Sequence, residues 1–313
     1  MLNNESLKGN KWKLKNFDDK LCLYLSQKYQ IPYFLSKLLI IRNIDEDKII
    51  NYFKADIITN LPNPFLLIDM KKAVLRLIQA LNNNQKIGII ADYDVDGAAS
   101  ASVLYKFLIN FTSNIVLKIP NRLIDGYGPN IKIMNEMLDE NVNLVFTLDC
   151  GTTAFNIIDK KKFEKIDVIV IDHHLSEPFL PKVYAIVNPN RFDENNNFKE
   201  MAAVGITFLF LMALRKLLRE NNFFNKKSEP NLMNYLDLVA LGTVCDVVNL
   251  TEYNRAFVKA GLDLIRKRKN QGIRQIIDNS NIRNTPTSLD LGFIIGPQLN
   301  AASRLDDSSL PSK

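Results

Sequence analysis

The sequence has few of the residues that build disulfide-rich or zinc-ribbon proteins. Its 313 residues include only three cysteines, Cys22, Cys150 and Cys245, and no two of them form a C-x-x-C pair. A small, odd number of cysteines favours a reducing compartment over a disulfide scaffold. No uninterrupted apolar run reaches the ~20 residues that span a bilayer. Residues 1–16 are polar and basic and lack the apolar core of a signal peptide, so we expect a cytoplasmic protein.

Histidine is also scarce, and the only two histidines, His173 and His174, are adjacent. The rest of the composition is ordinary for a globular protein, with 47% hydrophobic and 24% charged residues. The length suits one large domain or two modest ones. A formal net charge of +6 favours an anionic partner, although charge alone does not identify that partner as nucleic acid.

Short apolar runs alternate with helical patterns from residue 86 onward. Such an alternation predicts an α/β fold with a mostly parallel sheet flanked by helices. Buried parallel strands are expected to be continuously apolar, as these runs are. The expected strands lie at 87–90, 115–119, 144–148, 168–171 and 185–187, and the expected helices at 98–110, 131–138, 201–219, 231–241 and 256–268.

The first 82 residues have a different pattern. Residues 17–82 carry no strand signal, whereas a short helix is indicated after Pro32 and an amphipathic helix at 68–81. We therefore predict a small N-terminal helical segment over 1–82, followed by a catalytic domain over 83–313.

Acidic and imidazole side chains follow three of the expected strands. In an open parallel sheet, ligands bind outside the carboxyl ends of the strands, so these side chains should meet at one edge. A further acidic residue follows the helical run at 236–244. The residues concerned are Asp92, Asp94, Asp96, Asp149, Asp172, His173, His174 and Asp246.

Carboxylates gathered at one edge repel each other unless cations hold them. Several carboxylate oxygens with one or two imidazoles suit Mn²⁺ or Mg²⁺ better than a structural zinc. Two such ions, about 3.5–4 Å apart, can clamp a phosphate and activate water.

Each motif also has a plainer interpretation. The Asp-x-Asp-x-Asp-Gly stretch at 92–97 could be a calcium loop, but the Glu required six residues after the glycine is replaced by Val103. Asp149 alone could cap a helix, and the two histidines alone could end a strand. Cys150 and Cys245 each adjoin a proposed ligand, which leaves a mixed zinc site conceivable. Neighbouring side chains in extended structure point to opposite sides, which favours buried thiols. Taken together, the motifs favour a metal centre.

The triplet Asp172-His173-His174 resembles the motif that names the DHH phosphoesterase superfamily. The chain is also similar to the RecJ family of single-strand-specific exonucleases from about residue 20 to the end, and four further stretches carry this likeness. They are LPNPFLLIDMKKAV at 61–74, IPNRLIDGYG at 119–128, LDLVALGTVCDVV at 236–248 and GPQLNAASRLDD at 296–307. The second and fourth stretches point to RecJ rather than to the pyrophosphatases or cyclic-dinucleotide phosphodiesterases of the superfamily.

The resemblance implies a role for each matching position. His174 would face the scissile phosphate, with Asp92 and Asp172 in support. The implied ligands of two Mn²⁺ or Mg²⁺ ions are Asp94, Asp96, Asp149, His173 and Asp246. The implied nucleic-acid contacts are Arg122, Tyr127 and Arg304, and the alternative for the two arginines is a surface ion pair.

Two positions depart from the family pattern. Gln298 stands where arginine is usual and Ser303 where glycine is usual, so the grip on phosphate is expected to be weaker there. The family also continues past the matched region into a connecting helix, a second domain and an OB-fold, none of which is found in these 313 residues. We therefore expect this chain alone to cleave short substrates and to be poor on long strands.

The implied reaction is 5′ to 3′ hydrolysis of single-stranded DNA in repair and recombination, with release of mononucleotides. A monomer is expected, with single-strand-binding protein and a helicase as candidate partners. One alternative is another DHH phosphodiesterase, acting on short oligonucleotides or cyclic dinucleotides. A second is a non-catalytic replication scaffold, against which the intact ligand set argues.

Overall fold

The structure is a computed structural model. It describes residues 9–11, 13, 15–158, 161–196, 198–225, 227–282 and 284–305, without the side chains of residues 302, 304 and 305. Contacts between residues divide the chain into two compact units, Met1–Ala55 and Asp56–Lys313, and each unit is described by itself.

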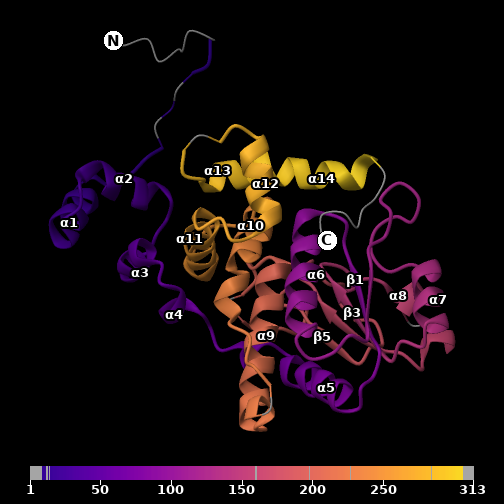
Figure 1. The fold of residues 1–313 in the computed structure, drawn as a ribbon. Helices are drawn as coiled ribbons and strands as arrows, with labels where there is room; N and C mark the ends of the chain where they lie inside the picture. The colour runs from indigo at the N-terminus through magenta and orange to yellow at the C-terminus, as the bar shows by residue number, and fades with distance from the viewer. Residues whose placement is uncertain are drawn as a thin grey trace. The chain divides into compact units, whose positions relative to one another are not determined.

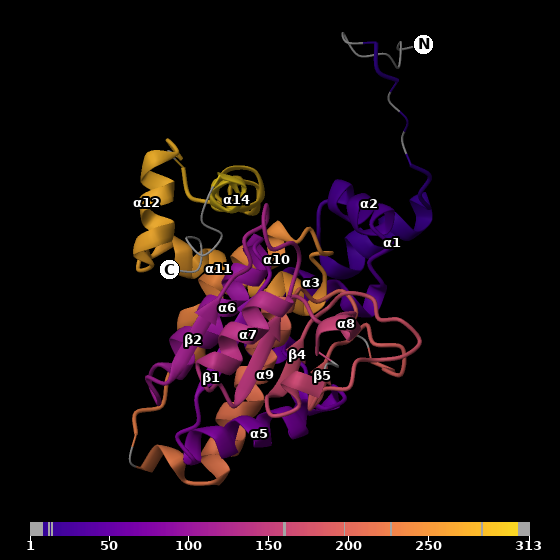
Figure 2. The same ribbon diagram turned by 90° about the vertical axis from the view of Figure 1, so that its right-hand side faces the viewer.

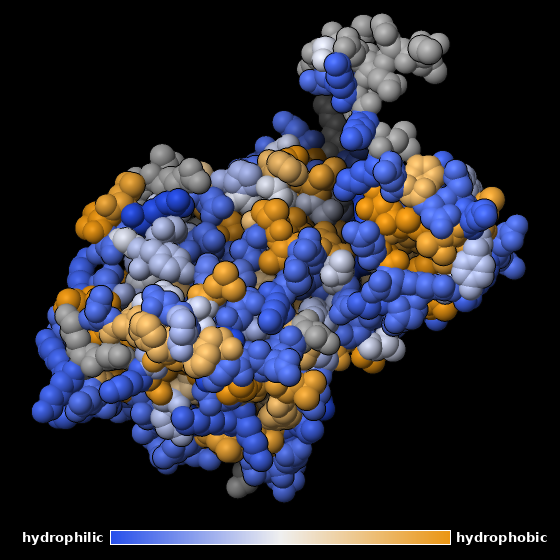
Figure 3. Space-filling model, turned by 180° about the vertical axis from the view of Figure 1, so that it is seen from behind, coloured by the Kyte–Doolittle hydropathy of each residue, from blue (hydrophilic) through white to orange (hydrophobic). Residues whose placement is uncertain are grey.

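The N-terminal unit is a small group of helices. Among its described residues, Leu25, Leu39 and Ile49 form a small buried core cluster. Several large apolar residues, among them Leu23 and Phe34, are exposed on its surface. Figure 3 shows orange, hydrophobic residues among the blue, hydrophilic ones on the molecular surface. The helix expected after Pro32 is present. The helices are α1 (Asp19–Tyr29), α2 (Tyr33–Ile41), η1 (Glu46–Lys48) and α3 (Ile49–Lys54).

A five-stranded, wholly parallel sheet forms the centre of the second unit (Figure 1). The strand order is β2-β1-β3-β4-β5, so β1 pairs with both β2 and β3. This confirms the fold class and the five strands expected from the apolar runs. The strands are β1 (Ile87–Ala91), β2 (Ile115–Lys118), β3 (Leu144–Leu148), β4 (Asp167–Ile171) and β5 (Ala185–Val187).

Helices cover both faces of the sheet because successive strand residues point to opposite sides. Phe146 of β3 packs in the core that contains α5 (Met70–Asn82), α6 (Val95–Leu108) and α9 (Ala203–Glu220). Its neighbour Val145 packs in the other core, with α7 (Ile131–Asp139) and α8 (Phe155–Ile158). Figures 1 and 2 show α6 and α9 on one side of the sheet and α7 on the other. Helix α5 packs against β5 and α9, and therefore belongs to the second unit.

The remaining long helices follow α9. Helix α10 packs against α6, α9 and α11, and the expected helices at 231–241 and 256–268 are present with shifted ends. The main helices are α10 (Leu236–Cys245), α11 (Glu252–Arg266), α12 (Gln271–Asn279), the π-helix η6 (Leu291–Ile295) and α14 (Gly296–Leu305). Shorter turns are α4 (Ile57–Asn60), η2 (Pro64–Leu66), η3 (Lys161–Phe163), η4 (Phe223–Asn225), η5 (Leu232–Tyr235) and α13 (Ser288–Asp290). No helix within the described ranges has both the length and the apolar character that a membrane crossing requires.

Gly261 permits the close approach of α11 to α10. A β-carbon at this position would lie 2.2 Å from the Leu236 carbonyl oxygen and 2.3 Å from the Ala240 β-carbon. Because that contact includes backbone, we expect Gly261→Ala to lower the free energy of unfolding by about 1–3 kcal/mol, as overpacking does. The control is Gly272→Ala, where the added carbon meets only the Asn270 side chain at 3.6 Å. Urea denaturation of both variants tests the prediction, and equal stabilities would contradict it.

Candidate metal centre

The candidate site residues gather at the ends of β1 and β3, where the connections that leave the two strands run over opposite faces of the sheet. From β1 the chain passes through α6 to β2, whereas from β3 it passes through α8 to β4, on the opposite face. A crevice forms outside the carboxyl ends of two strands whose connections diverge in this way.

Three acidic residues extend the strand ladder at this edge. The Asp92 amide donates to the Leu148 carbonyl (3.0 Å), and the Asp149 amide donates to the Ile171 carbonyl (2.9 Å). The Asp172 amide likewise donates to the Val187 carbonyl at 3.2 Å. Backbone pairing thus fixes three acids side by side at the ends of β1, β3 and β4, as the sequence pattern predicts.

The other two acids after β1 belong to helix α6, which begins three residues earlier than expected. Asp94 is its N-cap and accepts a hydrogen bond from the Gly97 amide (2.9 Å). Gly97 is required because a β-carbon there would lie 2.4 Å from the Asp92 carbonyl oxygen. Asp96 is buried in the first turn and accepts from the amides of Ala203 (2.7 Å) and Val204 (3.0 Å) at the start of α9. Asp96 therefore also anchors a second helix, which the sequence does not reveal.

Asp172 holds the two histidines in place. Its carboxylate accepts from the amides of His173 (2.8 Å), His174 (3.2 Å) and Thr152 (3.1 Å). It also lies 2.8 Å from His174 Nδ1. Such support fixes ring orientation and is characteristic of metal and catalytic histidines.

Two asparagines after β5 complete this support, and sequence reasoning missed both. Asn188 Nδ2 donates to the His174 carbonyl (2.9 Å) and Asn190 Nδ2 to the His173 carbonyl (2.5 Å). Asn188 also donates to Thr152 Oγ1 at 2.9 Å. The only signal in the sequence is that polar residues follow β5 as acids follow β1, β3 and β4.

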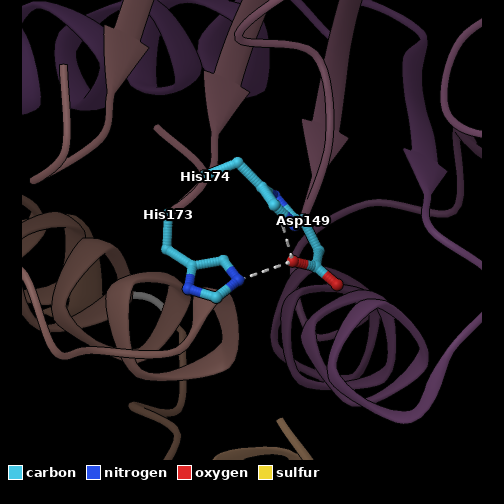
Figure 4. A group of neighbouring side chains, drawn as sticks. All are labelled: Asp149, His173 and His174. Carbon is cyan, nitrogen blue, oxygen red and sulfur yellow. Dashed lines mark ion pairs between the residues drawn. The ribbon is translucent and has the colours of Figure 1, made fainter. Parts of the chain in front are cut away.

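His173 lies between Asp149 and Asp246. Its Nε2 is 3.3 Å from Asp149 Oδ1, and its Nδ1 is 3.6 Å from Asp246 Oδ2. His174 Nδ1 lies 3.9 Å from the same Asp149 oxygen (Figure 4). Potential ligand atoms fall within 4.8 Å of one another in three groups: Asp149-His173-His174, Asp96-His173-Asp246 and Asp92-Asp94-Asp149. Because Asp149 and His173 each belong to two groups, the geometry suits neighbouring ions that share ligands.

Several buried polar atoms of this cluster lack a hydrogen-bond partner among the described residues. They are Asp92 Oδ1, Asp149 Oδ1, His173 Nε2 and Asp246 Oδ2. Buried polar atoms are rarely left unpaired, because each loses its hydration without compensation. These atoms are oxygen and imidazole ligands of the type that Mn²⁺ and Mg²⁺ accept, so the residues present fit such ions.

The carboxylates are destabilised in their charged form. Burial, together with the nearby Asp94, raises the pKa of Asp92 to about 7. Burial and Asp94 likewise raise the pKa of Asp246 to about 7. The pKa of Asp96 and that of Asp149 are raised well above the usual range by burial and by the surrounding acids. A divalent cation would offset this repulsion.

The two histidines are shifted in opposite directions. Burial lowers the pKa of His173, which favours the neutral imidazole that metals bind. The hydrogen bond to Asp172 raises the pKa of His174 to about 8, which favours the protonated ring at neutral pH. Although burial opposes ionisation of Asp172, its hydrogen bond with His174 keeps the pKa of this acid below the usual range.

Aromatic residues connect the expected nucleic-acid contacts to the cluster. The Tyr127 hydroxyl donates to the Asp149 carbonyl (2.9 Å) and lies 3.2 Å from His174 Nδ1. The Arg122 guanidinium lies over the Tyr93 ring, 4.8 Å from its centre, and the Tyr93 and Tyr127 rings meet edge to face. Arg122 and Tyr127 are therefore placed beside the cluster.

The C-terminal candidates are less fully placed. The side chain of Arg304 lies outside the described residues. Gln298 Nε2 donates to Ser280 Oγ (2.7 Å) and so links α14 to α12. Ser303 Oγ donates to the Asn300 carbonyl at 2.9 Å.

Cys150 and Cys245 lie next to the cluster residues Asp149 and Asp246. Cys150 is fully buried, and its thiol contacts the Leu148 carbonyl at 3.4 Å. The Cys245 thiol lies 3.5 Å from the Leu291 carbonyl, and burial raises its pKa to about 12. No cysteine occurs in the potential metal groups of the described chain. Cys150 is buried and Cys245 is half-buried.

A cavity of about 900 Å³ lies elsewhere in the second unit, between α6, α10, α12 and α14. It is lined by Lys106, Asp237 and Lys269 among others. None of its lining residues belongs to the acid–histidine cluster, which consists of Asp92, Asp94, Asp96, Asp149, His173, His174 and Asp246. The acid–histidine chemistry and this cavity are therefore separate features.

Comparisons with known proteins agree with this geometry. Residues 86–243 match the DHH family, N-terminal domain. The chain is 41% identical over 253 residues to the single-stranded-DNA-specific exonuclease RecJ of Haemophilus influenzae, covering 79% of this chain and 44% of that protein. Its fold is similar to a crystal structure of exonuclease RecJ bound to manganese, with a TM-score of 0.70 and 30% identity over 80% of this chain and 60% of that one. RecJ of Thermus thermophilus in complex with Mn²⁺ gives a TM-score of 0.74 and 25% identity over 93% and 40% of the two chains. The chain thus spans less than half the length of the Haemophilus influenzae protein (44%) and of the Thermus thermophilus chain (40%).

Proposed function

Because the chain belongs to the DHH family, we propose that it is a metal-dependent exonuclease that hydrolyses single-stranded DNA from the 5′ end. The observation that carries this proposal is the acid–histidine cluster, set in a chain that resembles RecJ proteins along most of its length. The proposed biological setting is DNA repair and recombination.

We propose that the cluster holds two Mn²⁺ or Mg²⁺ ions. The unpaired buried atoms of Asp149, His173 and Asp246 support this assignment. Bound ions of this kind lower the pKa of water and neutralise charge on a phosphate. The proposed ligands are Asp94, Asp96, Asp149, His173 and Asp246.

His174 is the proposed phosphate-facing group. Its Nδ1 is engaged by Asp172 at 2.8 Å, which leaves Nε2 for a substrate oxygen. The raised pKa keeps the ring protonated near neutral pH, so it can donate a hydrogen bond or a proton to the phosphate or to the leaving oxygen. Asp172 orients this ring, and Asp92 supplies a further buried carboxylate beside the ligands.

An exonuclease assay tests the proposal directly. A uniformly labelled single strand, the matching duplex and a cyclic dinucleotide would each be incubated with the chain and Mn²⁺. We expect mononucleotides from the single strand, little product from the duplex and none from the cyclic dinucleotide. Preference for the cyclic dinucleotide would assign another DHH activity, and the absence of any hydrolysis would favour a scaffold.

Arg122 is proposed to contact the phosphate backbone, with Tyr127 and Arg304 as further nucleic-acid contacts. Removal of one phosphate contact reduces the slope of log affinity against log salt concentration by about 0.7 for a single strand. We therefore expect Arg122→Ala to weaken oligonucleotide binding and to reduce the slope by roughly that amount. Lys106→Ala, in the separate cavity, is the matched control. Equal slopes for wild type and Arg122→Ala would remove Arg122 from the nucleic-acid path.

We further propose a cytoplasmic location and a monomeric state, with single-strand-binding protein and a helicase as partners. Three free cysteines support a reducing compartment. The exposed apolar residues of the N-terminal unit support a role in protein contacts.

A further inference from the structure

We propose that Val247 is a substrate-positioning residue whose side chain packs against the sugar or base of the nucleotide that enters the metal centre. This inference rests on the proposed function and adds a contact that neither the metal chemistry nor the phosphate contacts require.

Val247 stands at the edge of the acid–histidine cluster. It directly follows Asp246, whose Oδ2 lies 3.6 Å from His173 Nδ1. Consecutive α-carbons are about 3.8 Å apart, so the valine is an immediate neighbour of the cluster. The residue is 86% exposed, the highest value for a large apolar residue in the described part of the chain.

The backbone at Val247 is strained. Its φ is +62°, in the left-handed region, which disfavours β-branched side chains most strongly. Most other non-glycine residues with positive φ among the described residues are asparagine or aspartate, which tolerate this region, and Val247 is the only β-branched one. A helix such as α10 usually ends with glycine or asparagine at such a position.

The folded chain gains nothing evident from this valine. Glycine would relieve the backbone strain, and a polar residue would suit the exposure. An apolar side chain that is both strained and solvated is explained if it becomes buried when a ligand binds, because strain of this kind is concentrated at functional sites. Burial of its methyl groups then contributes to binding.

The chemistry of a nucleotide identifies the part that would cover Val247. The phosphate of the nucleotide would bind at the metal-binding acids and His174. Its sugar and base would therefore lie at the edge of the acid–histidine cluster. An aliphatic side chain contacts C–H groups or the face of any base and therefore adds affinity without sequence preference. Leu175, which directly follows His174 and is 80% exposed, offers a second aliphatic surface of the same kind.

The test compares three variants on two chromogenic diesters and one oligonucleotide. The diesters are thymidine 5′-(p-nitrophenyl) phosphate, which carries a nucleoside, and methyl p-nitrophenyl phosphate, which does not. We expect Val247→Gly and Val247→Ala to raise KM about five- to tenfold for the oligonucleotide and the thymidine ester, as the loss of a buried aliphatic contact does. Hydrolysis of the methyl ester and all kcat values should stay within about twofold. Val247→Ile should retain the wild-type KM.

Thermal unfolding separates the backbone strain at Val247 from its proposed contact with the nucleotide. Val247→Gly should melt at a higher temperature than wild type, whereas Val247→Ala, which keeps the β-carbon, should gain less. The control is Ile58→Ala on α4, a similarly exposed apolar residue (78%) whose helix carries no cluster residue, and its KM should not change.

Two results would overturn the inference. One is an unchanged KM for the thymidine ester in Val247→Gly. The other is an equal loss for the thymidine and methyl esters, which would mean that Val247 acts through the metal centre. Failure of the wild type to cleave the oligonucleotide would contradict the proposed function instead, and the thymidine ester would still decide the role of Val247.

Discussion

Asp149→Asn is expected to reduce Mn²⁺-dependent hydrolysis by roughly a thousandfold, in the range seen when a group that stabilises the transition state is removed. Asp149 belongs to two of the three potential metal groups, so its loss affects both proposed ion positions. Asparagine is the suitable replacement because residue 149 has a φ of +59°, which asparagine tolerates better than alanine. Initial rates on a labelled single strand provide the measurement.

The fold of this variant should be intact. Asp149 is buried among like charges, so the neutral amide should leave the metal-free protein at least as stable as wild type. Asp237→Asn is the matched control, since Asp237 is also a buried acid with a pKa raised by burial, but it lines the separate cavity. More than a tenth of wild-type activity in Asp149→Asn would show that the two-ion assignment is wrong.

The metal-free protein should lose stability as the pH rises from about 5 to 8, by several kcal/mol and thus about 5–10 °C in Tm. The pKa of Asp92 and that of Asp246 are raised to about 7 by burial, so the folded state holds protons that the unfolded state has released. Unfolding therefore releases protons in this window, and higher pH favours it. His174 acts in the same direction, because its pKa is raised to about 8 and its contribution is lost above that pH. Asp172, with a lowered pKa, contributes throughout the window and loses its effect only in acid.

Calorimetry in EDTA and in Mn²⁺ tests this pH dependence. Bound Mn²⁺ should remove most of the decline, because the ions compensate the carboxylate charges and bind only the folded state. Asp246→Asn should make the decline shallower in EDTA. A metal-free Tm that rises between pH 5 and 8 would contradict the electrostatic description of the cluster.

The sheet and the position of the cluster could be predicted because their signals are local. Continuous apolar runs mark buried parallel strands, and the acids that follow β1, β3 and β4 must then lie at one edge. Helix α5 was expected within two residues of its observed ends for the same reason, since its apolar residues recur at helical spacing.

The features that could not be predicted depend on contacts between distant segments or on short, weak patterns. Asp96 anchors the start of α9 through hydrogen bonds that span more than a hundred residues of sequence. Asn188 and Asn190 support the histidine backbone from a loop that has no motif of its own. The left-handed conformation of Val247 has no sequence signal, because valine is the residue least expected there.

Counting bound Mn²⁺ tests the central claim most directly. Titration of the metal-free chain, followed by electron paramagnetic resonance of free and bound Mn²⁺, gives both the stoichiometry and any magnetic coupling between ions. The acid–histidine cluster predicts two ions per chain at short separation, and Asp149→Asn should lose this coupled pair. A chain that binds one isolated ion or none, or whose coupled pair survives Asp149→Asn, would contradict the account.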